Sequence, residues 1–260
     1  MFKERIKKIY LYRYALWDMA MVQLKTKYAG SRLGIWWAVV IPLILTASIN
    51  FVFNVVFKIE IKHYTLFILS GIIPWFFFTN ALTEATNSFI INSSILKQRA
   101  SFPCEFIPIS SILANLLNFL IGLGFLLPLF IIFNLRVIWL LPFLLLIIIL
   151  NFIFLVGLGI LFSCFNVFFR DLAHFISIGF MIWFWITPVF YSLDIIPFPF
   201  RWICLFNPMT HYIVLYQDVL FRARTSSLLN LSVVFLISLI FILLGYIILV
   251  KKESLLLKRI

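Results

Sequence analysis

Side chains that could act as acids, bases, nucleophiles or metal ligands are few in this chain, and they are scattered. The three cysteines, Cys104, Cys164 and Cys204, have no CxxC spacing, and the three histidines lie equally far apart. General acid–base and metal chemistry need such groups within hydrogen-bond reach of one another. The sequence therefore predicts no catalytic residue, no metal site and no disulfide framework.

Nucleotide chemistry also lacks its usual sequence motif. A GxxxxGK[ST] loop, which cradles the phosphates of ATP, does not occur in the 260 residues. If ATP drives this protein, another polypeptide must bind the ATP and its Mg²⁺. We expect no cofactor in the chain itself.

The composition predicts an integral membrane protein. Hydrophobic residues make up 64% of the chain and charged residues 12%, whereas soluble domains are about half apolar and a quarter charged. The net charge of +12 would point to nucleic acid in a soluble protein. Basic residues also accumulate at the cytoplasmic ends of spanning helices, so we interpret the charge as a topology signal and expect no nucleic-acid partner.

Six uncharged or nearly uncharged segments have the length of a spanning helix, about 20 residues. They are residues 33–57, 64–91, 106–135, 137–169, 172–193 and 225–250. Six spans place both termini on one side of the membrane. Fifteen of the 21 Lys and Arg residues lie on that side, and basic residues mark the cytoplasmic face. The sequence predicts an all-α, multi-pass protein with six transmembrane helices and cytoplasmic termini.

The first 32 residues predict an amphipathic helix. Apolar residues recur every three or four positions over residues 6–28 and stack on one face, while Lys and Arg lie largely elsewhere. A basic helix rich in Trp and Tyr is expected to lie in the membrane interface. The alternative is a helix packed on a soluble partner. The stretch lacks the apolar core of a cleaved signal peptide, so we expect it in the mature protein.

Two of the connections between spans are long. Residues 92–105 are predicted on the cytoplasmic side and residues 194–224 outside. Pro197 and Pro208 break the outer connection, yet residues 202–217 stay apolar. They are too few to span a bilayer, so we predict that this segment re-enters the membrane without crossing it. Protein or a water-filled cavity must then satisfy its backbone.

The inner connection mixes apolar and basic residues, which are Ile95, Leu96, Lys97, Arg99 and Phe102. They act either as a topology signal alone or as a docking site for a soluble partner. A second charged turn holds Arg170 and Asp171. We expect Asp171 to cap the helix that follows, while Arg170 points to lipid phosphate or to a partner.

A few side chains inside the predicted spans are candidates for a substrate path. Glu84 lies 20 residues into its helix, about 30 Å at 1.5 Å per residue, and is either an anchoring charge or part of a substrate or gating path. Trp75, Trp183 and Trp185 fall near the bilayer middle. They either pack helices together or line a pore whose ring faces suit sugars. Trp183 and Trp185 are two residues apart, so at most one faces a pore.

Six short motifs follow one another along the chain. They are Leu33-Gly34-Ile35-Trp36-Trp37, Gly71-Ile72-Ile73-Pro74-Trp75-Phe76-Phe77-Phe78, Phe102-Pro103, Phe169-Arg170-Asp171-Leu172, Thr187-Pro188-Val189-Phe190-Tyr191 and Asn207-Pro208. In this order, over nearly the whole chain, the sequence resembles the membrane subunits of ABC-2 type exporters. The resemblance is to the permeases for O-antigen, capsule and teichoic acid polysaccharides.

The resemblance implies a homodimer with two copies of a separate ATP-binding subunit, which exports an undecaprenyl-linked polysaccharide across the bacterial inner membrane. It implies one domain over residues 1–260. Within that domain, residues 1–32 form the cytoplasmic interfacial helix and residues 33–193 form spans one to five. Residues 194–224 form an external region of re-entrant gate helices, and residues 225–260 form the last span and the cytoplasmic tail.

The resemblance and the topology together predict four groups of site residues. The ATPase-coupling group is Ile95, Leu96, Lys97, Arg99, Phe102, Arg170 and Asp171. The group that meets the lipid headgroup is Tyr28, Gly30, Ser31 and Arg32. The translocation path holds Trp75, Phe78, Glu84, Trp183 and Tyr191, and the external gate holds Pro197, Asn207, Pro208 and Tyr212.

Two alternative functions stay open at this point. An ABC-2 permease for a small amphiphile such as a drug predicts a narrower lumen and fewer central rings. A membrane-embedded transferase needs clustered acids or histidines, which the sequence lacks. We favour polysaccharide export, in which a hydrated polymer needs a continuous lumen that two chains can line together.

Overall fold

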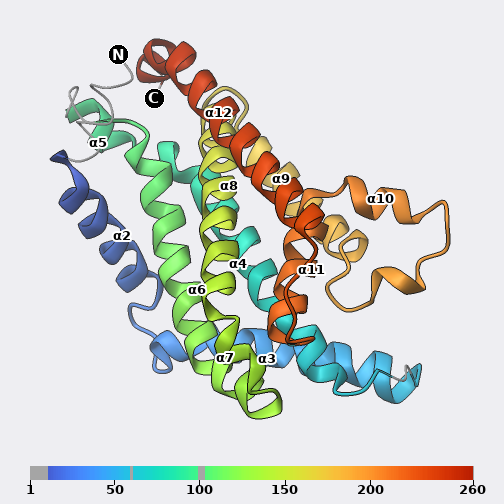
Figure 1. Cartoon of the computed structure of the whole chain (residues 1–260). Helices are drawn as coiled ribbons and strands as arrows, with labels where there is room; N and C mark the ends of the chain where they lie inside the picture. Colours follow the sequence, from blue (N-terminus) through green and yellow to red (C-terminus); the bar gives the residue numbers. More distant parts are fainter. Residues whose placement is uncertain (1–10, 59–60, 99–102, 260) are drawn as a thin grey trace.

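The computed structural model describes residues 11–58, 61–98 and 103–259, and the regular structure within them is entirely helical (Figure 1). In chain order the elements are α2 (Arg13–Lys27), η1 (Gly34–Trp36), α3 (Trp37–Asn50), η2 (Phe51–Val56), α4 (Tyr64–Ile91), α5 (Ser93–Gln98), α6 (Phe106–Phe133), α7 (Arg136–Trp139), α8 (Leu141–Phe168), α9 (Leu172–Ile186), η3 (Leu193–Ile195), α10 (Arg201–Phe206), α11 (Pro208–Leu220) and α12 (Leu228–Arg259).

Five helices among the described residues are long and apolar enough to cross a membrane. They are Gly34–Val56, Tyr64–Ile91, Phe106–Phe133, Leu141–Phe168 and Leu228–Leu256. These helices agree closely with five of the six predicted segments. The chain is therefore an all-helical, multi-pass membrane protein.

The remaining predicted segment, residues 172–193, is only partly helical. Helix α9 has 15 residues and ends at Ile186, which makes it about 22 Å long at 1.5 Å per residue. Thr187 follows with an extended backbone (ψ 133°). Pro188 accounts for the stop, because a proline disfavours helical dihedrals at the residue before it. Helix α9 alone is thus shorter than the hydrocarbon core of a bilayer, about 30 Å.

Helix α2 lies along α6 and connects to the first long helix. Ala20 and Leu24 of α2 pack against Ala114 of α6, whereas Tyr14 and Trp17 are exposed. The predicted apolar face is therefore divided between a part that packs inward and a part that faces outward. The first residues of the predicted helix, 6–10, lie outside the described part of the chain.

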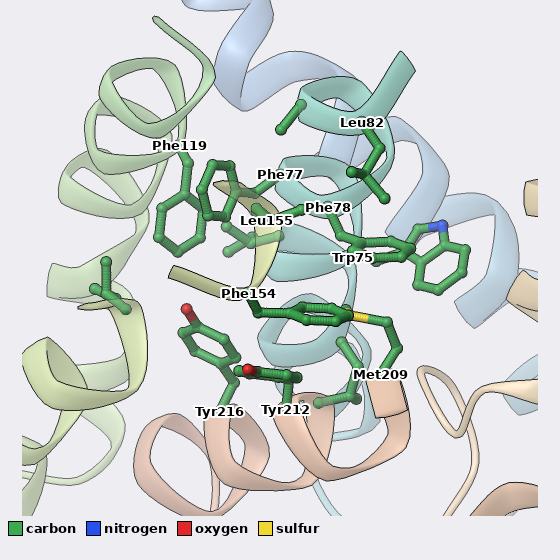
Figure 2. Close-up of a cluster of buried hydrophobic side chains, with 14 of the residues drawn as sticks. Trp75, Phe77, Phe78, Leu82, Phe119, Phe154, Leu155, Met209, Tyr212 and Tyr216 are labelled. Atoms are coloured by element: carbon green, nitrogen blue, oxygen red, sulfur yellow. The ribbon is translucent and has the colours of Figure 1, made fainter. Parts of the chain in front are cut away.

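Helix α4 occupies the centre of the bundle and contacts α3, α6, α8, α9 and α11. Of its most apolar 18 residues, 78% are buried. Figure 2 shows the aromatic side chains that fill the space around it. Phe78 stacks on Phe154 of α8 with ring centroids 6.2 Å apart, and it meets Trp183 of α9 edge-on at 5.2 Å.

Helices α8 and α12 cross at two glycines. A Cβ added to Gly157 would lie 2.3 Å from the backbone carbon of Phe241, and one added to Gly245 would lie 2.2 Å from the Gly157 carbonyl oxygen. Small residues let helix backbones approach closely in membranes, where packing contacts drive association. These two glycines therefore set the separation of α8 and α12.

Several chain segments meet at one end of the bundle. The Phe168 ring, at the end of α8, lies beneath Lys252 and Arg259 of α12. The sulfur of Cys104, just before α6, is 3.5 Å from a carboxylate oxygen of Glu253. Helix α5 and the C-terminal end of α12 both lie in the upper left part of Figure 1. This end holds α5, the α8–α9 turn and the end of α12. We call it the coupling end, after the coupling role that the sequence predicts for α5 and the turn.

Replacing Gly245 with Val is expected to destabilise the protein by about 1–3 kcal/mol, the usual cost of overpacking a close contact. The free energy of unfolding in detergent micelles is the measurement. Gly124→Val in α6 is the matched control, because a Cβ there meets no atom within 4 Å. Equal losses in the two variants would contradict the close crossing.

Candidate functional site

A polar network joins α2, α4 and α6. Lys27 Nζ donates hydrogen bonds to Glu84 Oε1 and to Asn115 Oδ1, both at 2.8 Å. The Asn115 amide donates in turn to Glu84 Oε2 at 2.6 Å. The side chains of Lys27 and Glu84 are 28% and 40% exposed. The anchoring role considered for Glu84 thus has a specific partner on the N-terminal helix.

Helical periodicity brings these polar side chains to one place. On α4, Asn80 lies four residues before Glu84, and on α6, Asn115 lies three residues before Asn118. Residues three or four apart share one face of a helix. Polar groups in an apolar bundle are costly unless hydrogen-bonded, so the two polar faces meet each other and Lys27.

A cavity of about 380 Å³ opens beside this network. We call it the α2–α3 pocket. It is lined by Lys27, Tyr28, Ser31, Trp37, Ala38, Ile41, Pro42, Phe76, Asn80 and Asn118. The lining combines hydrogen-bonding side chains with apolar ones, and its volume is in the range of small-ligand sites, about 300–1,000 Å³. Such a pocket suits an amphiphilic group.

The turn between α2 and η1 holds Ser31 at the pocket. Gly30 and Gly34 have positive φ values of 77° and 51°, which glycine adopts at little cost. The Ser31 hydroxyl oxygen accepts hydrogen bonds from Gly34 N–H (3.2 Å) and from Trp37 Nε1 (3.0 Å). Arg32, the next residue, is exposed. Tyr28, Gly30, Ser31 and Arg32 therefore lie together at one rim.

Tyr28 contributes a hydroxyl donor to the pocket. Its O–H group donates to Asn118 Oδ1. Burial raises the pKa of the Tyr28 phenol; the hydrogen bond with Asn118 acts in the opposite direction, and the nearby Glu84 charge raises the pKa further. Tyr28 is therefore protonated at neutral pH.

The described members of the predicted coupling group lie at the coupling end, with different exposures. Lys97, Arg170 and Asp171 are exposed, Ile95 is half-buried and Leu96 is buried. Arg99 and Phe102 lie outside the described residues. The coupling role of this group stays a prediction.

One detail of the charged turn differs from the expectation. Asp171 occupies the N-cap position of α9, but its side chain makes no capping hydrogen bond. A capping side chain normally needs an extended backbone, whereas Asp171 has helical dihedrals (φ −71°, ψ −12°). The expected side-chain cap is wrong, and only the charge of Asp171 acts on the helix dipole.

Of the predicted path residues, Trp75 and Phe78 are fully packed. Their exposed fractions are 4% and 0%, and both lie in the central cluster of Figure 2. Tyr191 donates its hydroxyl to the carbonyls of Trp185 (3.0 Å) and Ile186 (2.9 Å). Within one chain these residues have packing and structural contacts, and their place on a path stays a prediction.

Trp183 and Asn207, assigned to the path and the gate respectively, contact each other. Trp183 Nε1 donates to Asn207 Oδ1 at 2.7 Å, and the same oxygen accepts the Met209 N–H that begins α11. The Asn207 amide donates to Thr187 Oγ1 at 2.8 Å. Asn207 thereby ties the end of α9 to the start of α11.

The other gate residues are placed differently. Pro208 is the first residue of α11, where its missing N–H costs no helical hydrogen bond. Tyr212 is buried, with its hydroxyl 2.7 Å from Ser238 Oγ of α12. Pro197 is exposed in the connection before α10. The gate role of all four residues stays a prediction.

Comparison with known families decides the class of the protein. The family model described as ABC-2 type transporter matches residues 14–221. The chain belongs to the ABC-2 type transporter family. This stretch includes the α2–α3 pocket, the central cluster around α4 and all of α11.

Individual relatives of this ABC-2 transporter chain cover most of its length. It is 34% identical over 242 residues to the O-antigen export system permease protein RfbA of Klebsiella pneumoniae. The aligned residues cover 88% of this chain and 90% of the relative. A permease of the same name from Myxococcus xanthus is 28% identical over 221 residues, covering 84% and 85%.

The site of this family member offers polar groups that can bind a ligand. Among the described residues, no group of three His, Cys, Asp or Glu side chains is placed to hold a metal ion. Cys104, Cys164 and Cys204 are buried and free of disulfides. The α2–α3 pocket supplies hydroxyl, amide and ammonium groups, which recognise polar or anionic groups by hydrogen bonds.

Sequence reasoning missed several residues of the site. Lys27, Asn80, Asn115 and Asn118 line or support the α2–α3 pocket. The available signal was the spacing of asparagines inside otherwise apolar helices. Of the two α9 tryptophans considered for a pore, Trp185 is 61% exposed and Trp183 is half-buried.

Lys27→Met and Glu84→Gln are each expected to destabilise the protein, because each leaves the remaining charge with one partner fewer. The double variant is expected to lose less than the sum, with a coupling energy of about 0.5–1 kcal/mol, as for partly exposed ion pairs. Unfolding in detergent measures this cycle. Lys25→Met, at an exposed position of α2, is the control. Strictly additive effects would contradict the network.

Proposed function

We propose that this chain is the transmembrane subunit of an ATP-driven exporter that moves a lipid-linked, O-antigen-like polysaccharide across the bacterial inner membrane. It would act as a homodimer with two copies of a separate ATPase and with both termini in the cytoplasm. The observation that carries the proposal is the similarity to O-antigen export permeases over 88% of the chain.

The distribution of buried side chains supports a dimeric lumen. The interior of one chain is filled by rings such as Phe78 and Phe154, which have no exposed surface, so it leaves no room for a polymer. By contrast, of the 18 most apolar residues in Gly34–Val56 only 22% are buried, and the same share is buried in Leu228–Leu256. Phe180 is the one buried residue of α9. These open faces suit a second copy and a conduit between two chains.

The contacts after α9 support one more membrane crossing, in addition to the five long helices. Residues 187–190 continue from α9 in a non-helical conformation and are buried. Such backbone is tolerated at membrane depth where protein satisfies its polar groups. The Gln217 amide donates to the carbonyls of Pro188 (2.9 Å) and Val189 (3.3 Å), and Tyr64 O–H donates to Phe190 O (2.7 Å). We infer that α9 and this stretch form the fifth of six spans.

The length and burial of α11 support a re-entrant gate. Its 13 residues extend about 20 Å at 1.5 Å per residue, which is less than a bilayer core. Most of α11 is buried, and it contacts α4, α8 and α12. In the proposed function α10 and α11 dip into the bundle from outside and restrict the conduit.

The α2–α3 pocket suits the headgroup of a lipid-linked substrate. Ser31, Asn80 and Asn118 provide polar contacts, while Ile41 lines the pocket and is also 46% exposed on the outer surface of α3. A prenyl chain could therefore stay in lipid while its diphosphate reaches the pocket. Arg32 stands at the rim, and arginine binds phosphate with several parallel hydrogen bonds.

In this proposal the interfacial helix α2 holds the headgroup near the cytoplasmic face, and ATP-driven closure of the ATPase acts on α5 and the α8–α9 turn. The aromatic side chains on the outer faces of η1 and α9, including Trp36 and Trp185, would let sugar units slide past. No covalent step in this chain is needed.

Deleting the gene is expected to remove the exported glycan from the cell surface, and the wild-type gene is expected to restore it. The Arg32→Glu gene should restore less than about a tenth of the wild-type amount of surface glycan, because the substitution reverses the charge that attracts the diphosphate. Gel analysis of surface glycan is the measurement, and Lys25→Glu is the matched control. Unchanged glycan in the deletion strain, together with altered drug sensitivity, would favour a small-amphiphile exporter instead.

Lys97→Glu is expected to weaken binding of the ATPase subunit about fivefold, the effect of roughly 1 kcal/mol at an interface. Lys97 is exposed, so the substitution leaves the core intact. Affinity of the purified subunits and ATP hydrolysis of their complex are the measurements. Lys62→Glu, before α4 and also exposed, is the control. Equal ATPase affinities for the wild-type chain, Lys97→Glu and Lys62→Glu would contradict a contact between α5 and the ATPase.

A further inference from the structure

A second polar cavity lies at the opposite end of the bundle from α5. Its volume is about 380 Å³. It is lined by the C-terminal end of α11, by the loop before α12, and by Leu193, Asp194 and Arg201 from the segment that starts at η3. Asn230 of α12 lines it, whereas Lys252 of the same helix lies at the coupling end. The 22 helical steps from Asn230 to Lys252 extend about 33 Å at 1.5 Å per residue. The cavity therefore lies about one bilayer thickness from the coupling end.

Three arginines line this cavity, and we call it the outer arginine pocket. They are Arg201, Arg222 and Arg224. Two carboxylates, Asp194 and Asp218, also line it, which leaves a net positive charge. Arg201 pairs with Asp194 at 3.4 Å, with both side chains well exposed. An exposed pair of this length is weak, so Arg201 can turn to another anion.

Asp218 holds the other two arginines in place. Its side chain is only 4% exposed. Its Oδ1 atom accepts from Arg222 Nη1 at 2.8 Å and from Arg224 Nε at 3.0 Å, and Oδ2 accepts from Ser226 Oγ. A guanidinium has five N–H donors, and these contacts use only part of them. Both arginines thus keep donors for a ligand while their orientation is set in advance.

The lining favours phosphate over a sugar ring. Among the described residues that line the pocket, none is aromatic, so a sugar ring finds no stacking face there. The rings of the adjacent segment, such as Phe198 and Trp202, are exposed elsewhere on its surface. Guanidinium groups match phosphate oxygens in geometry and charge.

We propose that the outer arginine pocket binds the diphosphate headgroup of the lipid-linked substrate at the outer face, as a second headgroup site distinct from the α2–α3 pocket. This inference rests on the proposed function. A headgroup that starts at the cytoplasmic face must finish at the other face, and an unpaired diphosphate in an apolar medium is costly. The pocket supplies the opposite charge at that point.

Binding of geranylgeranyl diphosphate to the purified full-length chain in nanodiscs tests the site. All variants carry Arg32→Gln to weaken the inner site. Adding R201Q and R224Q together is expected to weaken binding by at least about tenfold, since the loss of even one charge-assisted hydrogen bond has an effect of that size. Thr225→Trp should do the same by filling the pocket without changing its charge. Arg136→Gln, an exposed arginine outside the pocket, is the matched control.

Several results would contradict the site. The Arg32→Gln chain would fail to bind the probe, the pocket variants would bind it as well as the Arg32→Gln chain does, or the Arg136→Gln control would lose as much affinity as the pocket variants. Displacement of the probe by an equal concentration of phosphatidylglycerol would also overturn it, since the occupant would then be a bilayer lipid. The measurement needs neither ATPase nor export. The two proposals can fail separately. If the probe binds through the pocket while deletion of the gene leaves surface glycans unchanged, the proposed function is contradicted but the diphosphate site is not.

Discussion

The burial of α4 among its neighbours is the contact on which the other helices depend. In lipid, apolar surface alone gives helices little reason to associate, so close packing and hydrogen bonds decide which faces meet. Helix α4 supplies both kinds of contact. Its rings, including Trp75 and Phe78, fill the interior, and Glu84 on its polar face binds Lys27. One helix thus positions both the core of the bundle and the N-terminal helix beside it.

Irregular backbone inside the bundle follows the same constraint. The chain leaves helical geometry directly after α9 and again just before α11, where its carbonyls and N–H groups would be costly in hydrocarbon. Side chains replace the missing helical partners: Gln217 donates to two carbonyls, and Asn207 caps α11 while contacting Trp183. These amides let a short, buried helix sit against α4 and α8. A short helix held in this way needs no water-filled cavity to satisfy the backbone around it.

The two polar cavities lie at different depths in the bundle. Asn80 and Asn118 of the α2–α3 pocket are near the middles of α4 and α6, whereas the outer arginine pocket lies at the C-terminal end of α11. The α2–α3 pocket and the outer arginine pocket are similar in volume but differ in chemistry. The first combines amides and hydroxyls with the apolar surface of α3, while the second is built from guanidiniums held by Asp218. This difference suits an amphiphile that approaches from lipid on one side and a charged group that leaves at the other.

Local properties were enough to predict most of the helices. The segment 64–91 coincides with α4, because hydropathy and length depend only on neighbouring residues and on the thickness of the membrane. The fifth segment was predicted too long, since Pro188 ends α9 while hydropathy continues beyond it. Tyr28 and Ser31, which the family resemblance assigns to headgroup entry, both line the α2–α3 pocket, and their role there stays a prediction.

Which polar side chains meet was established only by the packed chain. Lys27 and Glu84 are 57 residues apart in sequence, and their contact depends on the rotation and tilt of two helices. Nor does periodicity tell whether a ring such as Trp75 faces a conduit or the interior, because it identifies helix faces but not what covers them. Contacts between distant segments arise from the simultaneous packing of all the helices, and no local pattern encodes that arrangement.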